Sequence, residues 1–158
     1  AIENVVWNLG GASNHNSESN GLASHWYSYE RGTTVYTGRP TTWTGKIGLI
    51  YPSDYGYATS GGASKDKAAC LSKELYNWNN SDFNDCYDND YLANGWKSTM
   101  TPSSDVAFSV TLIETLGRVE IYPAHYGVNV YPTLYLKSSF TIKDGNGSEN
   151  SPYQLNIE

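Results

Sequence analysis

The stretch Val106–Phe140, VAFSVTLIETLGRVEIYPAHYGVNVYPTLYLKSSF, decides how this chain folds. It contains three runs with the character of strands, separated by two turns. Val106, Phe108 and Val110 begin a period-two alternation that ends at Leu112, and this pattern predicts a strand with one buried face. Leu116-Gly117-Arg118 predicts a tight turn in which Gly117 takes a positive φ.

The apolar face of this stretch is expected to continue after the turn through Val119, Ile121, Val128, Val130, Leu134 and Leu136. Polar and aromatic residues stand between these positions and are expected to be exposed. A sheet that carries such a row is more typical of a binding surface than of a catalytic cleft. The row consists of Arg118, Glu120, Tyr122, His125, Tyr126, Asn129 and Tyr131.

Length and charge limit the classes of partner. The 158 residues fit a single domain, 1–158, that can bury a substantial core. Ten Lys and Arg stand against 16 Asp and Glu, and no basic run is longer than two residues, so nucleic acid and anionic membrane surfaces are unlikely partners. No signal peptide or transmembrane run is recognisable, which predicts no direct membrane insertion, and the start at Ala1 is typical of an excised ectodomain.

The aromatic composition favours an extracellular module. Fourteen Tyr and five Trp outnumber three Phe and one Met, and Gly, Ser, Asn and Thr are abundant. This makeup is typical of a chain rich in loops and strands, and Tyr, Ser, Asn and Gly also dominate antibody paratopes. The alternative is that many of these tyrosines only border the core.

The two cysteines, Cys70 and Cys86, are sixteen positions apart. A disulfide between them closes a loop of about 15 residues, worth about 3 kcal/mol in the chain-entropy model. A zinc site lacks nearby His partners, and a catalytic thiol lacks an activating neighbour. The disulfide interpretation places the chain outside the cytoplasm.

The coarse order of elements predicts an α+β domain with antiparallel sheets, one main helix and long irregular loops. The helix is expected over 64–77, with Ser64 as its cap and an apolar face made of Ala68, Leu71, Leu75 and Trp78. Strands are expected over 1–9, over 43–51, and as a final hairpin of 140–143 and 153–157. The stretch 52–62 is glycine-rich and expected to be irregular, allowing backbone segments to pass closely.

No catalytic or metal motif stands out. Asp82, Asp85, Asp88 and Asp90 are weak calcium candidates, but their spacing does not match an EF-hand, and a solvated loop with capped turns is the alternative. No Ser-His-Asp set is singled out. Three carboxylates, Glu30, Asp54 and Glu120, can converge in space as a catalytic pair, but nothing in their spacing requires it. The sequence therefore predicts no enzyme and no cofactor, with calcium as the possible exception.

Several motifs resemble a family of bacterial surface domains of unknown function, found largely in Firmicutes and related gut bacteria, some behind a prepilin-like segment. The resemblance covers roughly residues 7–155. It rests on the segment WTGKIGLIYPSDYGYA (43–58), the Cys70-Leu71-x3-Leu75-x2-Trp78-x7-Cys86 pattern, Tyr91-Leu92, Thr99-Met100-Thr101-Pro102, Gly117-x-Val119, Gly127-Val128 and Pro132-x-Leu134-Tyr135-Leu136.

The closing pattern is also similar to the C-type-lectin-like fold of formylglycine-generating enzymes and of the variable proteins made by diversity-generating retroelements. This similarity implies a mixed α+β domain whose last strands carry tolerant, exposed positions for ligand binding. Two residues depart from the family pattern: Tyr131 replaces an Arg, and Ser98 replaces a Trp. Both departures adjoin the expected surface, which suits a face that varies between members, and Ser98 joins the candidate residues.

Three functions follow in order of preference. The first is a non-enzymatic binding or adhesion module, displayed on a bacterial surface or pilus, that recognises a protein or a glycan. The second is a structural subunit of a pilus or filament that contacts its neighbours. The third is an enzyme, which predicts convergent carboxylates or a His in a deep pocket.

Overall fold

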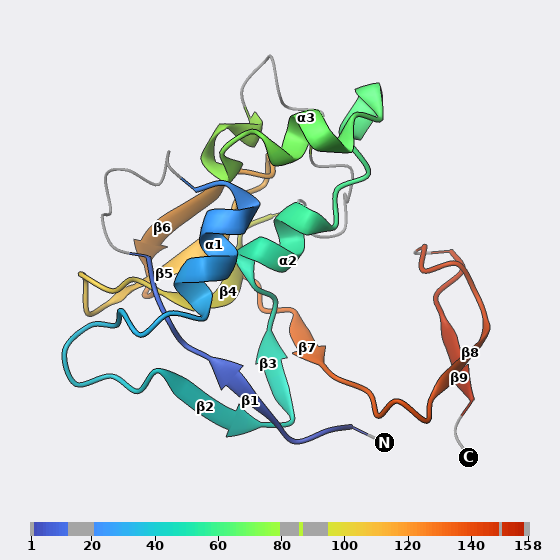
Figure 1. Cartoon of the computed structure of the whole chain (residues 1–158), viewed down its shortest axis with the longest axis horizontal. Coiled ribbons are helices and arrows are strands. Elements are labelled where there is room, and N and C mark those ends of the chain that lie inside the picture. Colours follow the sequence, from blue (N-terminus) through green and yellow to red (C-terminus); the bar gives the residue numbers. More distant parts are fainter. Residues whose placement is uncertain (1, 13–20, 80–85, 87–94, 149, 157–158) are drawn as a thin grey trace.

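The computed structural model describes residues 2–12, 21–79, 86, 95–148 and 150–156. Within these residues the chain forms short helices and several small antiparallel sheets, which confirms the α+β class (Figure 1). The elements in chain order are β1 (Val5–Asn8), α1 (Ala23–Glu30), β2 (Thr42–Gly45), β3 (Ile47–Leu49), α2 (Pro52–Tyr57), η2 (Gly62–Ser64), α3 (Lys67–Leu71), η3 (Leu75–Asn79), β4 (Lys97–Pro102), β5 (Ser109–Ile113), β6 (Val119–Pro123), β7 (Pro132–Leu134), β8 (Thr141–Asp144) and β9 (Gln154–Asn156).

The central sheet has the order β4-β5-β6 and is antiparallel throughout. Its buried face does not follow the predicted alternation: Phe108 is 62% exposed, whereas Thr111 and Ile113 are buried. The strand begins only at Ser109, because 106–108 form a turn in which the Ser109 N–H donates to the Val106 carbonyl at 3.2 Å. The pairing of Ile113 with Val119 then sets which face points inward. The predictions for Leu112, Val119 and Ile121, all buried, and for Gly117, with φ of 83°, are confirmed.

The core lies between the buried face of the central sheet and the helices. Trp26 of α1, Tyr55 of α2, Leu75 and Trp78 of η3, and the disulfide pack against the sheet residues Ile113, Val119 and Ile121. Two neighbouring rings, those of Tyr55 and Trp78, lie 5.5 Å apart between centroids. This core therefore combines the helical layer, the disulfide and one face of the central sheet.

The sequence predicted an irregular stretch over 52–62. This prediction is wrong for its first half, which forms α2. Pro52 occupies the start of this helix, where its fixed φ fits and its missing N–H costs nothing. Gly56 lets α2 pass close to α1, because a Cβ at this position would stand 2.8 Å from the Cβ of Ala23. The predicted close passage of backbone is thus confirmed, but inside a helix.

The single helix expected over 64–77 is also wrong. Lys65 takes a left-handed φ of 56°, which ends η2, and α3 then starts behind Asp66. The Asp66 carboxylate caps this short helix by accepting from the Ala69 N–H at 2.9 Å. Leu75 and Trp78 still reach the core as predicted, but from η3, whereas Ala68 is exposed.

Two small sheets, β1-β2 and β3-β7, enclose Trp7. The Trp7 ring lies against Gly48 and stands 5.2 Å from the ring of Tyr135. The strand predicted over 43–51 is divided at Lys46, so that its two halves pair with different partners. The start of the chain joins the segment after β7, because the Glu3 N–H donates to the Tyr135 carbonyl and Ile2 bridges Leu136.

The segment around β7 contradicts the expectation of a buried face. Val130 is 62% exposed, and Leu134 and Leu136 are also exposed. The reason is that β7 pairs only with β3, and no described element covers the outer side of this two-stranded sheet.

The predicted C-terminal hairpin is confirmed as the antiparallel pair β8-β9. Figure 1 shows it standing apart from the rest of the molecule at the end of an extended connection from β7. All four residues of β8 are exposed.

Candidate functional site

The segment after β6 crosses one face of the central sheet and carries most of the predicted surface. β6 is one edge of this sheet and β4 is the other. Asn129 nevertheless pairs with β4: the Ser98 N–H donates to the Asn129 carbonyl at 3.0 Å, and the Asn129 N–H donates to the Trp96 carbonyl at 2.9 Å. Residues 124–128 must therefore pass from one edge to the other, and we call them the crossing segment.

The sheet register shows which face is crossed. Ser98 of β4, Leu112 of β5 and Glu120 of β6 form one row of cross-strand partners, and partners in such a row share a face. Tyr122 lies on the same face, two residues beyond Glu120. Leu112 is fully covered, so this face is buried at its centre and open toward its rim.

Four aromatic residues form a continuous row between the sheet and the crossing segment. The Trp96 and Tyr122 rings meet edge to face at 4.7 Å, and the Tyr122 and Tyr126 rings do so at 5.9 Å. The row ends where His125 stacks on Tyr126 at 4.8 Å with an interplanar angle of 25°. We call Trp96, Tyr122, Tyr126 and His125 the aromatic row. Its inner rings are half-buried and its outer pair is exposed, Tyr126 by 51%.

Arg118 is held in an ion-pair network and is not a free cation. Its guanidinium donates to both oxygens of Glu114, at 2.9 and 2.6 Å, and pairs with Glu120. It also lies 4.9 Å from the centre of the Tyr76 ring. Burial alone would lower the pKa of Arg118, but the hydrogen bond to Glu114 and the charges of Glu120 and Glu114 outweigh it and raise the pKa.

This network affects the aromatic row through Tyr122. Partial burial raises the pKa of the Tyr122 phenol, and the charges of Glu120 and Glu114 raise it further. Tyr122 therefore keeps its proton at neutral pH and remains a hydrogen-bond donor. The network contains one formal positive charge and two negative charges, so the surface beside the aromatic row is slightly acidic.

At the β4 edge, the last predicted residue meets a buried lysine. The Lys97 ammonium lies 5.1 Å from the centre of the Tyr131 ring and donates to the Gly95 carbonyl at 3.0 Å. Burial lowers the pKa of Lys97. Asn129 and Tyr131 thus flank β4, while Tyr122, Tyr126 and His125 lie over the face between the edges.

The structure places six of the eight predicted residues on or over one face of the central sheet: Ser98, Arg118, Glu120, Tyr122, His125 and Tyr126. The other two, Asn129 and Tyr131, flank the β4 edge, where Tyr131 lies beside Lys97. The exposed groups are His125, Tyr126 and Asn129, whereas Arg118 and Glu120 are engaged with each other. Trp96, which contacts Tyr122, was not among the predicted residues. Its signal was available: Trp96 stands two residues before Ser98, and residues at that spacing in a strand share a face.

A second cluster contains two of the three carboxylates considered as a catalytic pair. Glu30 accepts from the Ser53 N–H at 2.8 Å and from the Ser53 hydroxyl, and Arg31 lies 3.0 Å from the same carboxylate. Burial raises the pKa of Glu30 to about 7, and burial also raises the pKa of nearby Asp54. Glu120 belongs to the other network.

The position of Glu30 indicates a joint between helices. It lies at the end of α1, its partner Ser53 lies in the first turn of α2, and its side chain is fully buried. Because the Glu30 side chain is fully buried and bonded to Ser53, its geometry fits the fastening of α1 to α2 better than contact with a substrate.

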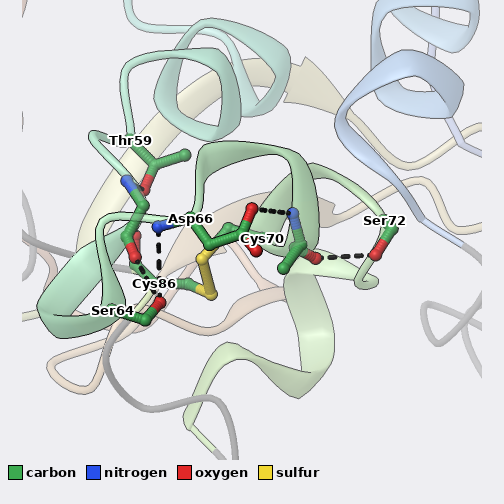
Figure 2. The surroundings of a disulfide bond; sticks show 8 residues. Thr59, Ser64, Asp66, Cys70, Ser72 and Cys86 are labelled. Atoms are coloured by element: carbon green, nitrogen blue, oxygen red, sulfur yellow. Dashed lines mark hydrogen bonds between the residues drawn. A yellow bond between two sulfur atoms is a disulfide. The ribbon is translucent and has the colours of Figure 1, made fainter.

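The predicted disulfide is confirmed: Cys70 of α3 is bonded to Cys86 with an S–S distance of 2.04 Å (Figure 2). Thr59 holds the far side of the bond, since its hydroxyl donates to the Cys86 carbonyl. Both cysteines are buried within the core. The bond fixes the end of the segment that follows η3 to the helical layer.

The calcium candidates Asp82, Asp85, Asp88 and Asp90 lie outside the described residues. Among the residues that the structure does describe, no group of three or more His, Cys, Asp and Glu could hold a metal ion. The loop after Asp144 is a turn, in which the Asn146 side chain accepts from the Ser148 N–H at 3.0 Å. In the same described part of the chain, none of the helices has the length and apolar character needed to cross a membrane.

Comparisons with models of protein families, with curated proteins and with solved structures found no match to this chain.

Proposed function

We propose that this chain is a non-enzymatic extracellular binding module, displayed on a bacterial surface or pilus, that recognises a protein or a glycan through the aromatic row. The observation that carries the proposal is the exposed, stacked pair of Tyr126 and His125 at the end of that row. Exposed aromatic rings supply large contact areas at a low cost in side-chain entropy, and they stack on sugars and side chains alike.

The surroundings of the pair support recognition. The inner rings, Trp96 and Tyr122, fix the outer rings by edge-to-face contacts, so little freedom is lost on binding. The Asn129 side chain and the Tyr122 hydroxyl add polar groups beside the rings. The disulfide supports the extracellular assignment, because such bonds persist in oxidising compartments.

The test is a binding screen followed by paired substitutions. The wild-type chain is applied to glycan and protein arrays, and each hit is measured again with Tyr126→Ala and with Tyr122→Ala combined with Tyr131→Ala. We expect the affinity for the ligand to fall about tenfold or more, since central aromatic contacts carry most binding energy. Tyr57→Ala is the matched control, because Tyr57 is an exposed tyrosine on α2, away from the row.

Two results would contradict the proposal. One is a set of hits whose affinities are unchanged in both aromatic variants while the variants remain folded. The other is an equal loss of affinity in Tyr57→Ala.

The second candidate function, a pilus or filament subunit, predicts a contact between copies of the chain. One observation favours such a contact: the apolar side of β7 and the C-terminal hairpin both lie uncovered.

A further inference from the structure

An apolar stripe lies uncovered on the outer face of the β3-β7 sheet. Ile47 pairs with Leu134 and Leu49 pairs with Pro132, so these four side chains share one face. Gly48, on the opposite face, lies against Trp7, which shows that the stripe points away from the interior. Continued by two positions beyond each end of β7, the alternation adds Val130 and Leu136 to this face. We call Ile47, Leu49, Val130, Pro132, Leu134 and Leu136 the outer stripe.

The exposure of this stripe is high for a strand with an alternating pattern. Val130 is 62% exposed and Ile47 is 51% exposed. A period-two apolar pattern is what a strand with one covered face shows. The pattern therefore predicts that another element packs on this face, and the described part of the chain does not supply one.

The C-terminal hairpin is uncovered as well and has two unlike faces. Ile142 pairs with Leu155 on one face, and Thr141 pairs with Asn156 on the other, where the Asn156 amide donates to the Thr141 hydroxyl at 3.2 Å. Ile142 is 59% exposed and Tyr153 is 55% exposed. A lone two-stranded hairpin is only marginally stable in water. Its apolar face needs a surface to pack on.

The tip of the hairpin is nevertheless built to hold its shape. Gly145 and Gly147 take positive φ, and the N–H groups of Asn146 and Gly147 both donate to the Ser151 carbonyl at 3.0 Å. The Tyr153 ring lies so close to Gly147 that a Cβ there would stand 2.7 Å from it. The hairpin is thus a preformed element whose apolar face is exposed.

The connection between the two features directs the hairpin away from its own stripe. Residues 137–140 form a turn in which the Phe140 N–H donates to the Lys137 carbonyl at 3.0 Å. Figure 1 shows the hairpin well separated from β7 at the end of this connection. A second copy of the chain, in contrast, offers an identical free stripe and an identical free hairpin.

The exposed area is sufficient for a weak dimer. The stripe and the hairpin face together present about ten partly exposed apolar side chains, roughly 600 Å² per copy at about 60 Å² each. A reciprocal exchange would therefore bury about 1,200 Å² in total, at the lower end of specific interfaces. A contact in which the hairpin of each copy packs on the stripe of the other is isologous, and it gives a closed two-fold dimer.

We propose that the apolar face of the β8-β9 hairpin of one copy covers the outer stripe of a second copy. The contact uses none of the four residues of the aromatic row, so it can be tested separately from the ligand-binding proposal. It supplies the cover that both patterns lack.

Directed crosslinking tests the contact. Leu134→Cys and Ile142→Cys are made in two chains that carry tags of different mass, and the mixed chains are treated with a short bismaleimide. We expect a mixed, crosslinked pair. The native cysteines do not interfere, because they are buried and bonded to each other. The matched control replaces Ile142→Cys by Thr141→Cys, which places the thiol on the polar face of the same strand.

Sedimentation over a concentration series supplies the second measurement. We expect reversible self-association that Ile142→Asp weakens about tenfold or more and that Thr141→Asp leaves unchanged. Crosslinks equal in the Thr141→Cys control, a strictly monomeric chain at every concentration, or a Leu134→Cys/Ile142→Cys double variant that links only within one chain would each overturn the proposal. Circular dichroism of every variant verifies that the body remains folded.

Discussion

The central sheet and the C-terminal hairpin share the alternating pattern of strands, but the central strand β5 is buried and the hairpin strand β8 is exposed. β5 is buried on both faces, because Ile113 packs in the core with the helices and Leu112, on the opposite face, is also fully buried. β8 has no covered residue at all. Alternation in a sequence thus specifies a strand and its two faces, but the partner that covers a face comes from elsewhere in the chain or from another molecule.

This contrast predicts that equal truncations have very different effects on stability. Trp78→Ala removes a fully buried ring that packs against Tyr55, and we expect it to lower the free energy of unfolding by about 3–5 kcal/mol. Chemical denaturation followed by tryptophan fluorescence or circular dichroism measures this change. A loss below 1 kcal/mol would show that the core around η3 is loosely packed.

The disulfide should account for a second large share of the stability of the body. Replacing both Cys70 and Cys86 with Ser opens a loop with a sequence separation of 16, and we expect a loss of about 3 kcal/mol. Denaturation of the double variant in comparison with the wild type provides the measurement. An unchanged midpoint would mean that the packing around the bond holds this loop without it.

The Glu30 joint predicts a pH dependence with a defined sign. Its pKa is raised from 4.5 to about 7 in the folded state, chiefly by burial, so folding favours the protonated form. The stabilisation is complete below about pH 4.5, falls as the pH rises, and is lost above about pH 7, a change of about 3 kcal/mol. Asp54, whose pKa is also raised, adds to the same trend.

The measurement is the free energy of unfolding from pH 5 to pH 8 for the wild type and for Glu30→Gln. The variant, which cannot ionise, should show a much smaller slope. Asp144→Asn serves as the control, because this carboxylate lies exposed in the hairpin. A wild-type stability that rises over this range would contradict the assignment.

The smallest effect is expected in the hairpin. Tyr153→Ala, studied at a concentration where the chain is monomeric, should change the unfolding of the body by less than about 0.5 kcal/mol, because the ring packs on Gly147 within the hairpin itself. Thermal unfolding at high dilution measures it. A loss comparable to that of Trp78→Ala would show that the hairpin belongs to the cooperative core.

The sequence predicted local features well where one residue type settles the geometry. Gly117 takes its positive φ, the two cysteines pair, and the glycine-rich hairpin closes as expected. The prediction of one helix over 64–77 was wrong because two signals compete there. The apolar spacing persists through the stretch, but Lys65 takes a left-handed φ and the helix starts only after it, with Asp66 as its cap.

The remaining errors concern partners that are distant in the sequence. Phe108 and Val110 follow the alternation, yet Phe108 lies outside β5 and is exposed, and β5 itself is buried on both faces. α2 escaped notice because Gly56 weakens a helical pattern, and only the nearness of Ala23 explains why glycine stands there. The candidate residues were identifiable one by one, but the pairing of Asn129 with β4, which draws the crossing segment over the sheet, left no local trace.

The pairing of the first residues with the segment after β7 has a mechanical consequence. Ile2 and Leu136 are antiparallel partners, and Glu3 bonds to Tyr135 just behind them. In this arrangement the incoming and outgoing chains leave the pair from the same end. Tension applied between residue 2 and the hairpin would therefore load these contacts one after another, as in a zipper. They would open at low force, before the tension reached the part of the fold that the disulfide holds.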